Sequence, residues 1–345
     1  MAYIPVRVRE NEVSAKLLAA GLTRTHQGKV RDTYDLGNGR LLVVTTDRLS
    51  AFDILLPEEI EQKGPTLTAL SIFWFTVVLK KFRNHLVAFG SQIDRYLSSW
   101  PELCRWPELR KRAVIVRKLE MVPIEAIARG YLTGTGWSDY QRDGGKVCGV
   151  QLREGLFNGA KLDETLFSPS SKAFVGHDVN LDAATVVAQH GEWIKLCTIA
   201  TYDLAAEYAA KHGIILVDTK FEFGWEENEP VLADEVCTPD SSRFWKRSEW
   251  EEAARKRQPP TSYDKQIVRD WGKTVQTPFF GKQGEPLTFA TLKPQIDDHT
   301  RWVEDHLHVP DEIRQRTTAG YLEIAELLTG KSLARFQEED MHVAA

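Results

Sequence analysis

The stretch from Ile214 to Gly224 restricts the fold of this chain more than any other segment. Its first four residues are apolar and predict a buried strand. In the continuation, Asp218, Lys220 and Glu222 share one strand face, while aromatic residues occupy the other. The aromatic face is expected to pack on a core. The charged face must therefore look into solvent or into a cleft.

Two carboxylates that flank a lysine on one strand face resemble a magnesium and phosphate site. Asp234 and Glu235, on the next expected strand, add acid at hairpin distance. The alternative is a solvated sheet face that carries a cross-strand ion pair. The pattern by itself leaves both interpretations open.

The remaining patterns predict an α+β chain. Residues 180–212 have helical spacing and stop at Gly213, and residues 231–234 form a partner strand. Two strand-like runs flank Gly37-Asn38-Gly39, which is a strong hairpin signal. Further expected elements are strands over 113–119 and 123–132, helices over 66–82 (capped by Thr66) and 310–328, a linker over 255–262, and a frayed polar end after Arg335.

Length, charge and cysteine spacing exclude several classes of protein. The 345 residues suffice for two domains, and the net charge of −5 speaks against a main role in coating nucleic acid or an anionic membrane. No apolar run predicts a membrane-spanning helix. The cysteines lie far apart without a CxxC pair, which argues against a zinc site or a disulfide framework. We expect a reduced, cytoplasmic protein.

Three other segments combine cations, hydroxyl groups and glycines. Gly28-Lys29-Val30-Arg31-Asp32 places two cations on one strand face beside exposed amides, which suits a polyphosphate. Residues 125–136 carry Glu125 and Arg129 before a Gly/Thr-rich turn, and residues 238–245 hold Arg243 between hydroxyls and aromatics. An exposed strand edge, a glycine-rich turn and a helix-capping turn are the simpler interpretations of the three.

Taken together, these motifs resemble one family, the SAICAR synthetases (phosphoribosylaminoimidazole-succinocarboxamide synthases) of purine biosynthesis. The resemblance covers residues 22–272 and follows the family's motif order. It is carried by residues 28–32, 46–53, 63–64, 125–136, 169–172 with His177-Asp178, 218–224, 234–236, 238–245, and 263–266 with 269–271.

The resemblance implies a reaction and an architecture. The reaction is the ATP-dependent joining of L-aspartate to the carboxylate of carboxyaminoimidazole ribonucleotide (CAIR), which gives SAICAR, ADP and phosphate. The architecture would be a β-rich, kinase-like N-terminal lobe over residues 1–117, a mixed, ATP-grasp-like central lobe over 118–272, and a helical extension over 273–345 that packs on the central lobe. An acyl phosphate is the simplest way for ATP to activate a carboxylate, and it needs cations and Mg²⁺ more than a protein nucleophile.

The resemblance also implies which residues hold the nucleotide and the metal ion. Glu222 and Asp234 would hold Mg²⁺ on the ATP phosphates. Residues 117–121 would form a hinge beside the adenine. The phosphates would be held by Gly28, Lys29, Val30 and Arg31 of the hairpin, with Lys172 assisting from its loop.

For the other substrates, the resemblance implies a second set of residues. The reacting CAIR carboxylate would be lined by Glu125, Asp218 and Lys220, and the CAIR 5′-phosphate would be bound by Arg129, Thr135 and Arg243. Some family members have serine where this chain has Thr135, and the hydroxyl is kept. The remaining substrate contacts, including those to aspartate, are expected from Ser50, Asp53, Lys63 and Asp240.

Two alternatives remain at this point. One is another ATP-dependent carboxylate–amine ligase or a small-molecule kinase on the same scaffold, which would differ in the phosphate pocket at Arg129 and Arg243. The other is a nucleotide-binding protein without catalysis, which the loss of a metal carboxylate or of Lys29 would support. The chain keeps all of these residues. Its oligomeric state, monomer or small homo-oligomer, is left open by the sequence.

Overall fold

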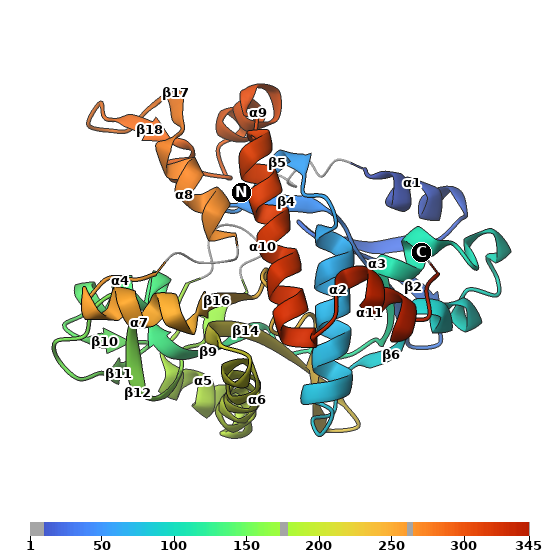
Figure 1. Ribbon diagram of the computed structural model, residues 1–345, viewed down its shortest axis with the longest axis horizontal. Helices are drawn as coiled ribbons and strands as arrows, with labels where there is room; N and C mark the ends of the chain where they lie inside the picture. Colours follow the sequence, from blue (N-terminus) through green and yellow to red (C-terminus); the bar gives the residue numbers. More distant parts are fainter. Residues whose placement is uncertain (1–9, 173–178, 261–264, 345) are drawn as a thin grey trace.

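The N-terminal part of the chain forms a five-stranded antiparallel sheet. The computed structural model describes residues 10–172, 179–260 and 265–344 (Figure 1). His177-Asp178 and Tyr263-Asp264, which carry part of the resemblance, lie outside these residues. The strand order is β1-β2-β3-β7-β6, with β1 Thr23–Gln27, β2 Arg31–Gly37, β3 Arg40–Thr45, β7 Ala113–Arg117 and β6 Leu86–Phe89.

The turn between β2 and β3 confirms the expected hairpin. Gly37 pairs with Arg40, and both residues between them, Asn38 and Gly39, have positive φ angles of 48° and 68°. A two-residue turn of this handedness matches the twist of the flanking strands, which is why Asn-Gly favours it. Helices α1 (Glu12–Ala19) and α3 (Pro107–Arg112) pack on the sheet around a core that contains Leu17, Tyr34, Leu42 and Ile115.

Helix α2 (Lys63–Phe73) crosses the middle of the molecule and continues as a π-helical turn over Trp74–Val78. The helix expected over 66–82 is therefore confirmed, but the expected cap is wrong. The helix starts three residues earlier, after Gln62, and the Thr66 hydroxyl donates to the Gln62 carbonyl from within the first turn. Ten of the eleven α2 residues are buried. Because nearly all of its side chains are buried, α2 has no polar face whose first residue could mark the start of the helix in the sequence.

The central sheet is built around the long strand β14 (Ile214–Glu226), which confirms the buried strand and its continuation. The path β12-β9-β14-β15 comprises β12 Ala160–Phe167, β9 Ile124–Leu132, β14 and β15 Glu229–Ala233. Three shorter strands join it: β16 (Ser242–Lys246) and β8 (Glu120–Met121) pair with β14, and β13 (Ser170–Ser171) pairs with β9.

Helices cover the aromatic face of this sheet. The helical pattern over 180–212 is two helices, α5 (Ala183–His190) and α6 (Trp193–Lys211), because Gly191 breaks it with a φ of 92°. Phe221 and Phe223 are buried beneath them, and Trp193 meets the Phe223 ring edge-on at 5.7 Å. Helix α4 (Gly134–Arg142), the short hairpin of β10 (Lys146–Val147) and β11 (Val150–Gln151), and helix α7 (Arg247–Arg255) complete this region.

The C-terminal part of the chain packs against both regions described above, the N-terminal region and the central region. Helix α8 (Gln266–Thr274) and helix α9 (Asp297–His306) share a core with the hairpin of β4 (Arg48–Ala51) and β5 (Ile54–Glu59). Helix α10 (Asp311–Thr329), which confirms the expected helix over 310–328, lies along α2 (Figure 1). Between α8 and α9, β17 (Gln276–Phe280) and β18 (Pro286–Thr288) form a projecting hairpin. The expected α+β class is confirmed, whereas the division into units at residues 117 and 272 stays a prediction.

The expectation of a frayed end after Arg335 is wrong. Helix α11 (Leu333–Glu339) places Phe336 in the main core, and Met341 and Val343 are buried after it. The Ser91 amide donates to the Met341 carbonyl at 3.0 Å, which ties the tail to the N-terminal region. Although this segment is mainly polar, apolar residues recur every few positions, and their burial holds the segment in place. Within the described residues, no helix is long and apolar enough to cross a membrane.

The buried tail predicts that the C terminus contributes directly to stability. Phe336→Ala should lower the free energy of unfolding by about 3–5 kcal/mol because it leaves a cavity beside Phe73. Phe280→Ala is the matched control, since Phe280 is 68% exposed and its loss should change the free energy by less than about 0.5 kcal/mol. Urea unfolding followed by circular dichroism measures both. Equal effects in the two variants would contradict the packing of the tail.

Candidate functional site

Two adjoining cavities lie over the charged face of β14. The larger is enclosed by the N-terminal sheet, α2 and β14, and the smaller by β9, β14, residues 239–243 and the start of α8. The larger has a volume of about 570 Å³ and the smaller about 160 Å³. Both are lined by the same four residues at their common boundary, which are Lys220, Asp240, Lys265 and Arg269. A molecule in one cavity can therefore contact a molecule in the other.

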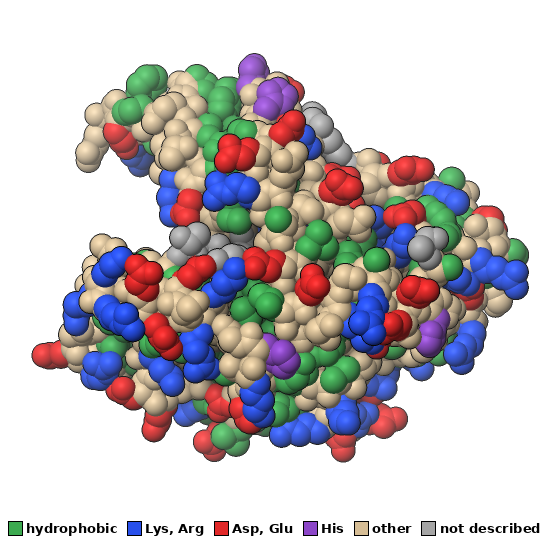
Figure 2. Space-filling view, in the orientation of Figure 1, with side chains coloured by type: hydrophobic (Ala, Val, Ile, Leu, Met, Phe, Trp, Pro, Cys, Tyr) green, Lys and Arg blue, Asp and Glu red, His purple; other side chains and the backbone are tan. Residues whose placement is uncertain are grey.

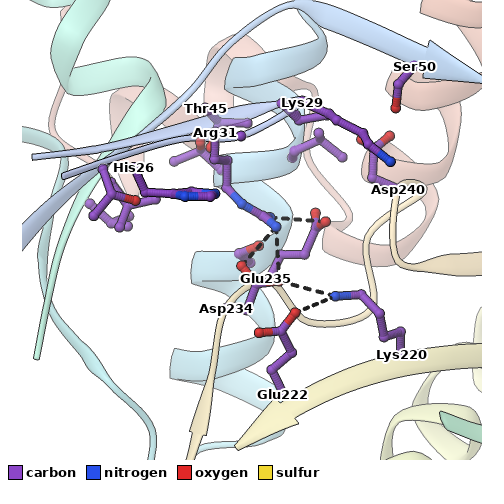
Figure 3. A pocket seen from close by; sticks show the side chains of 18 of the residues that line it. His26, Lys29, Arg31, Thr45, Ser50, Lys220, Glu222, Asp234, Glu235 and Asp240 are labelled. Carbon is purple, nitrogen blue, oxygen red and sulfur yellow. Dashed lines mark hydrogen bonds and ion pairs between the residues drawn. The ribbon is translucent and has the colours of Figure 1, made fainter. Parts of the chain in front are cut away.

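The hairpin that leads into β2 forms one wall of the larger cavity. The Gly28 amide donates to the Arg31 carbonyl at 2.8 Å, and a Cβ at position 28 would meet that oxygen at 2.7 Å. This close approach requires glycine. Lys29 and Arg31 both line the cavity (Figure 3), and Lys29 Nζ lies 2.6 Å from the Asp53 carboxylate. Val30 also lines the cavity, and it packs against Leu67 and Tyr321.

Opposite the hairpin, carboxylates converge on Lys220. Its Nζ lies 2.7 Å from Glu222 and 3.4 Å from Asp234 (Figure 3), and 3.6 Å from Glu125. Glu222 on β14 pairs with Ala233, the last residue of β15, and the chain turns at Asp234, whose φ is 58°, so that its carboxylate reaches the same cluster. Burial alone would lower the pKa of Lys220, but the neighbouring carboxylates Glu222, Asp234 and Glu125 raise it above its usual range.

Arg31 links the hairpin to this cluster across the cleft. Its guanidinium contacts Asp234 at 2.8 Å and Glu235 at 3.0 Å. Lys172, from the loop after β13, pairs with Glu222. Burial by itself would raise the pKa of Asp234, but Arg31, Lys220 and Lys172 hold it well below its usual range. The site therefore combines the ionised Asp234 carboxylate with three cations within one cluster.

Glu222 and Asp234 suit a hard divalent cation when other oxygen ligands are supplied. Their carboxylates come from adjacent strands and converge on one point, now occupied by the Lys220 ammonium. Within the described ranges, no three His, Cys, Asp or Glu side chains are grouped closely enough to hold a metal ion by themselves. Mg²⁺ is commonly bound by one or two carboxylates together with water and substrate phosphates. The donor set fits that kind of site.

The far end of the larger cavity is apolar and was not predicted. It is bounded by Ile72 and Phe75 of the α2 region, with side chains of β3, β6 and β7, which are Val43, Leu86 and Val114. Such a compartment suits a flat heterocyclic base. Residues 117–121, expected to form the hinge beside it, are absent from the lining. Arg117 instead pairs with Glu226 at 3.2 Å.

His85 also lines this end and was assigned no site role from the sequence. Its Nε2 lies 3.2 Å from the Asp234 carbonyl oxygen, and its ring lies 5.6 Å from that of Phe75. Burial lowers the pKa of His85 to about 4, so the imidazole is neutral near pH 7. The pairing of residues 84–85 with the β15 region brings it here, and no local pattern marks that contact.

The smaller cavity is an arginine pocket held by Asp218. On β14, Asp218 is in register with Arg129 of β9 and with Arg243 of β16, and it pairs with both guanidinium groups. Arg129 also donates to Ser168 at 2.8 Å and to Thr135 at 3.0 Å. Glu125 lines only the larger cavity and Lys220 lines both, so of the two residues with which Asp218 was grouped, only Lys220 shares its cavity.

Gly134 allows Arg243 to reach this pocket. Its φ is +57°, and a Cβ there would meet the Arg243 guanidinium at 2.5 Å. Two arginines, a threonine hydroxyl and the serines of the 241–242 turn then line a space of about 160 Å³. Fork-shaped guanidinium donors of this kind bind phosphate monoesters well.

The four remaining expected contacts fall in different places. Ser50 and Asp53 line the larger cavity, where Asp53 has a φ of 63°. Lys63 is fully buried and outside the lining of both cavities, because it pairs with Asp240 at 2.8 Å. Asp240 lines both.

Lys265 and Arg269 line both cavities as well, but no site role was predicted for them. They stand four residues apart at the start of α8, so they share a helix face. Both belong to the motif that carries the resemblance. That motif is the signal that could have identified them.

This chain is similar to known proteins over most of its length. The family model described as SAICAR synthetase matches residues 24–285. A phosphoribosylaminoimidazole-succinocarboxamide synthase of Thermobifida fusca is 42% identical over 90% of this chain and 92% of its own length, and one of Polaromonas naphthalenivorans is 41% identical over 88% and 93%. The solved SAICAR synthase of Saccharomyces cerevisiae, complexed with SAICAR, is 34% identical over 90% of this chain and 96% of its own, with a TM-score of 0.70.

The close approach at Gly134 predicts a selective loss of phosphate binding. Gly134→Ala should weaken the binding of ribose 5-phosphate about 10-fold, because the new methyl group displaces the Arg243 guanidinium. Gly144→Ala is the matched control: its φ is +62°, so it carries the same backbone strain, but no atom lies within 4 Å of its Cβ. Isothermal titration calorimetry measures both. Equal losses would show that backbone strain, not displacement of Arg243, is responsible.

Proposed function

This chain belongs to the SAICAR synthetase family, and from that premise we propose how its two adjoining cavities carry out the family's reaction. The protein is a ligase of purine biosynthesis that uses ATP to join L-aspartate to the carboxylate of CAIR, with SAICAR, ADP and phosphate as products. The observation that carries the proposal is the shared boundary of the two cavities at Lys220, Asp240, Lys265 and Arg269. ATP would occupy the larger cavity, and the phosphate of CAIR the smaller.

ATP would enter the larger cavity in one orientation. Its adenine would enter the apolar end beside Phe75 and Val114, and its phosphates would extend toward the cations of the hairpin. Lys29, Arg31 and Lys172 would bind these phosphates, while Gly28 and Val30 keep the hairpin close. In exchange, Arg31 and Lys172 would leave the carboxylates that they now contact.

Glu222 and Asp234 would hold Mg²⁺ on the ATP phosphates. The ion would neutralise charge on the transferring phosphoryl group. Lys220, whose ammonium now pairs with both carboxylates, would then turn toward the phosphate oxygens or toward the CAIR carboxylate. In the free protein the carboxylates raise its pKa and keep that ammonium protonated.

CAIR would bind with its 5′-phosphate between Arg129, Thr135 and Arg243. Asp218 holds both guanidinium groups in place from β14. The imidazole carboxylate would then reach the boundary, where Glu125 and Lys220 lie. The carboxylate oxygen attacks the γ-phosphorus, the bond to the ADP oxygen breaks, and an acyl phosphate forms.

L-aspartate would approach the same carbonyl carbon from the side of β4 and α8. Lys265 and Arg269 would attract its carboxylates, and Ser50 and Asp53 would orient its amine. The amine nitrogen attacks the carbonyl carbon and loses a proton, and phosphate leaves with the electron pair of the broken C–O bond. Lys63, buried behind Asp240, supports the boundary rather than contacting substrate.

We also propose the cellular location and the oligomeric state of the protein. A cytoplasmic location is supported by the four cysteines, all of which are free thiols. The protein acts on small molecules, and its assembly as a monomer or a small homo-oligomer stays a proposal.

Release of ADP tests the proposed function. The purified protein is incubated with ATP, Mg²⁺, CAIR and L-aspartate, and each is omitted in turn. Release that requires all four, together with a succinyl-carboxamide product by mass spectrometry, is the expected result. Release without aspartate would indicate a kinase-like or uncoupled enzyme, and no release with ATP still bound would indicate a non-catalytic nucleotide binder.

The metal assignment makes a further prediction. Asp234→Asn should lower kcat about 100-fold and raise the Mg²⁺ concentration needed for half-maximal rate, because a neutral amide is a weaker ligand for a hard cation. Asp163→Asn, at a side chain that is 70% exposed, is the control and should leave both quantities unchanged. Steady-state kinetics over a range of Mg²⁺ concentrations measures the effect. An unchanged Mg²⁺ requirement in a folded Asp234→Asn enzyme would remove Asp234 from the metal site.

A further inference from the structure

A tyrosine from the C-terminal helix α10 reaches the boundary between the two cavities. Tyr321 is 1% exposed, and its hydroxyl donates to Asp240 Oδ1 at 2.6 Å. Its ring packs against Val30 of the hairpin and Leu67 of α2. Tyr321 lies beyond residues 24–285, the part matched by the family model.

The other carboxylate oxygen of Asp240 is held by two lysines. Lys63 Nζ lies 2.8 Å and Lys265 Nζ 2.9 Å from Asp240 Oδ2. The Asp240 side chain is only 2% exposed. Burial by itself would raise its pKa, but Lys265 and Lys63 together with the Tyr321 hydroxyl hold it well below its usual range. Asp240 is therefore a fixed carboxylate with donors on both oxygens.

This arrangement makes Asp240 unsuited to bind an anionic substrate directly and well suited to orient its neighbours. The 238–241 turn that carries it leads directly into β16, where Arg243 forms part of the phosphate pocket. Lys265, on its other side, lines both cavities. A small rotation of the Asp240 carboxylate would therefore shift Lys265, a cation that lines both cavities.

Tyr321 limits that rotation. Without its hydroxyl, Oδ1 would lose its donor, and the carboxylate could turn to meet Lys63 and Lys265 with either oxygen. Buried carboxylates are costly unless each oxygen is hydrogen-bonded, so the side chain would move to recover a donor. Lys63 is too deeply buried to follow, because its side chain is 0% exposed. Lys265, at 12%, is the partner that would shift.

We propose that Tyr321 is a positioning residue for the ligase reaction: its hydroxyl fixes Asp240, which in turn holds Lys265 and the turn before Arg243 where CAIR and L-aspartate meet. The inference rests on the proposed function, because it names which substrates depend on the contact. Helix α10 thereby contributes to the site through one hydroxyl group, although it carries no residue of the cavity linings.

The test compares Tyr321→Phe with Tyr208→Phe in the full-length protein. Both changes remove a tyrosine hydroxyl that contacts a partner across α10, since Tyr208 donates to the Leu328 carbonyl of that helix at 2.9 Å. Both keep the aromatic ring, so packing against Val30 and Leu67 is preserved in the first. Of the two tyrosines, only Tyr321 contacts Asp240. Melting temperatures are measured alongside steady-state kinetics with each substrate varied in turn.

The expected result is a change confined to two substrates. Tyr321→Phe should lower kcat/KM for CAIR and for L-aspartate about 10-fold through higher KM values, with the KM for ATP within about 2-fold of wild type. Tyr208→Phe should leave all three KM values unchanged. A merely structural role would reduce the amount of folded enzyme, which lowers the apparent kcat and leaves every KM as it was.

Several outcomes would overturn the inference. They are wild-type KM values for CAIR and L-aspartate in Tyr321→Phe, a change restricted to the KM for ATP, or equal changes in the two variants. Failure of the proposed function is separate, because it is read from the wild-type protein alone. A wild-type protein that releases no ADP with all substrates present would reject the ligase reaction whatever the variants do.

Discussion

The burial of charge on one face of β14 is the constraint on which the rest of this structure depends. Asp218 and Glu222 are each only 5% exposed, and Lys220 lies between them. Unpaired charges in such a place would cost many kcal/mol, so each must find partners from other elements. Asp218 finds Arg129 and Arg243 on the two neighbouring strands. The cluster around Lys220 needs partners from farther away.

One of those distant partners links the two main parts of the molecule across the cleft. Arg31 reaches from the N-terminal hairpin to Asp234 (Figure 3), and Lys172 comes from the loop after β13 within the central part. The same cations are the ones that a triphosphate would take. In the proposed reaction, the substrates would therefore compete with Asp234 and Glu222 for these cations.

The C-terminal helices complete this arrangement from behind. Helix α10 runs along α2 and brings Tyr321 to Asp240, while α8 brings Lys265 to the same carboxylate (Figure 1). Figure 2 shows mixed charges of both signs over the visible face, with a deep indentation between the region of β17 and β18 and that of α4 and α7. The concentrated charge of the protein is thus inside, at the cleft, rather than in one patch on that face.

Local chemistry in the sequence determined the elements and the types of functional residue. Asn38-Gly39 specified its hairpin because the turn needs positive φ at both positions, and alternation in 218–224 specified which side chains share a face. The motif order identified the family and, with it, the reaction. These features depend on neighbours within a few residues, or on residue identities that chemistry fixes wherever they occur. They could therefore be inferred without coordinates.

Tertiary structure alone decided how the functional residues are shared among cavities and which hidden groups support them. It separated Asp218 from Glu125, placed Lys63 behind Asp240, brought His85 to the apolar end, and buried the tail at Phe336 and Met341. Each of these placements depends on a contact between segments far apart in the chain, such as the 81 residues between Asp240 and Tyr321. No local pattern records such a contact, because a buried lysine or tyrosine has the same neighbours in sequence whichever carboxylate it meets. The sequence determined which residue types are available, whereas the packing of the sheets and helices around β14 determined which of them are in contact.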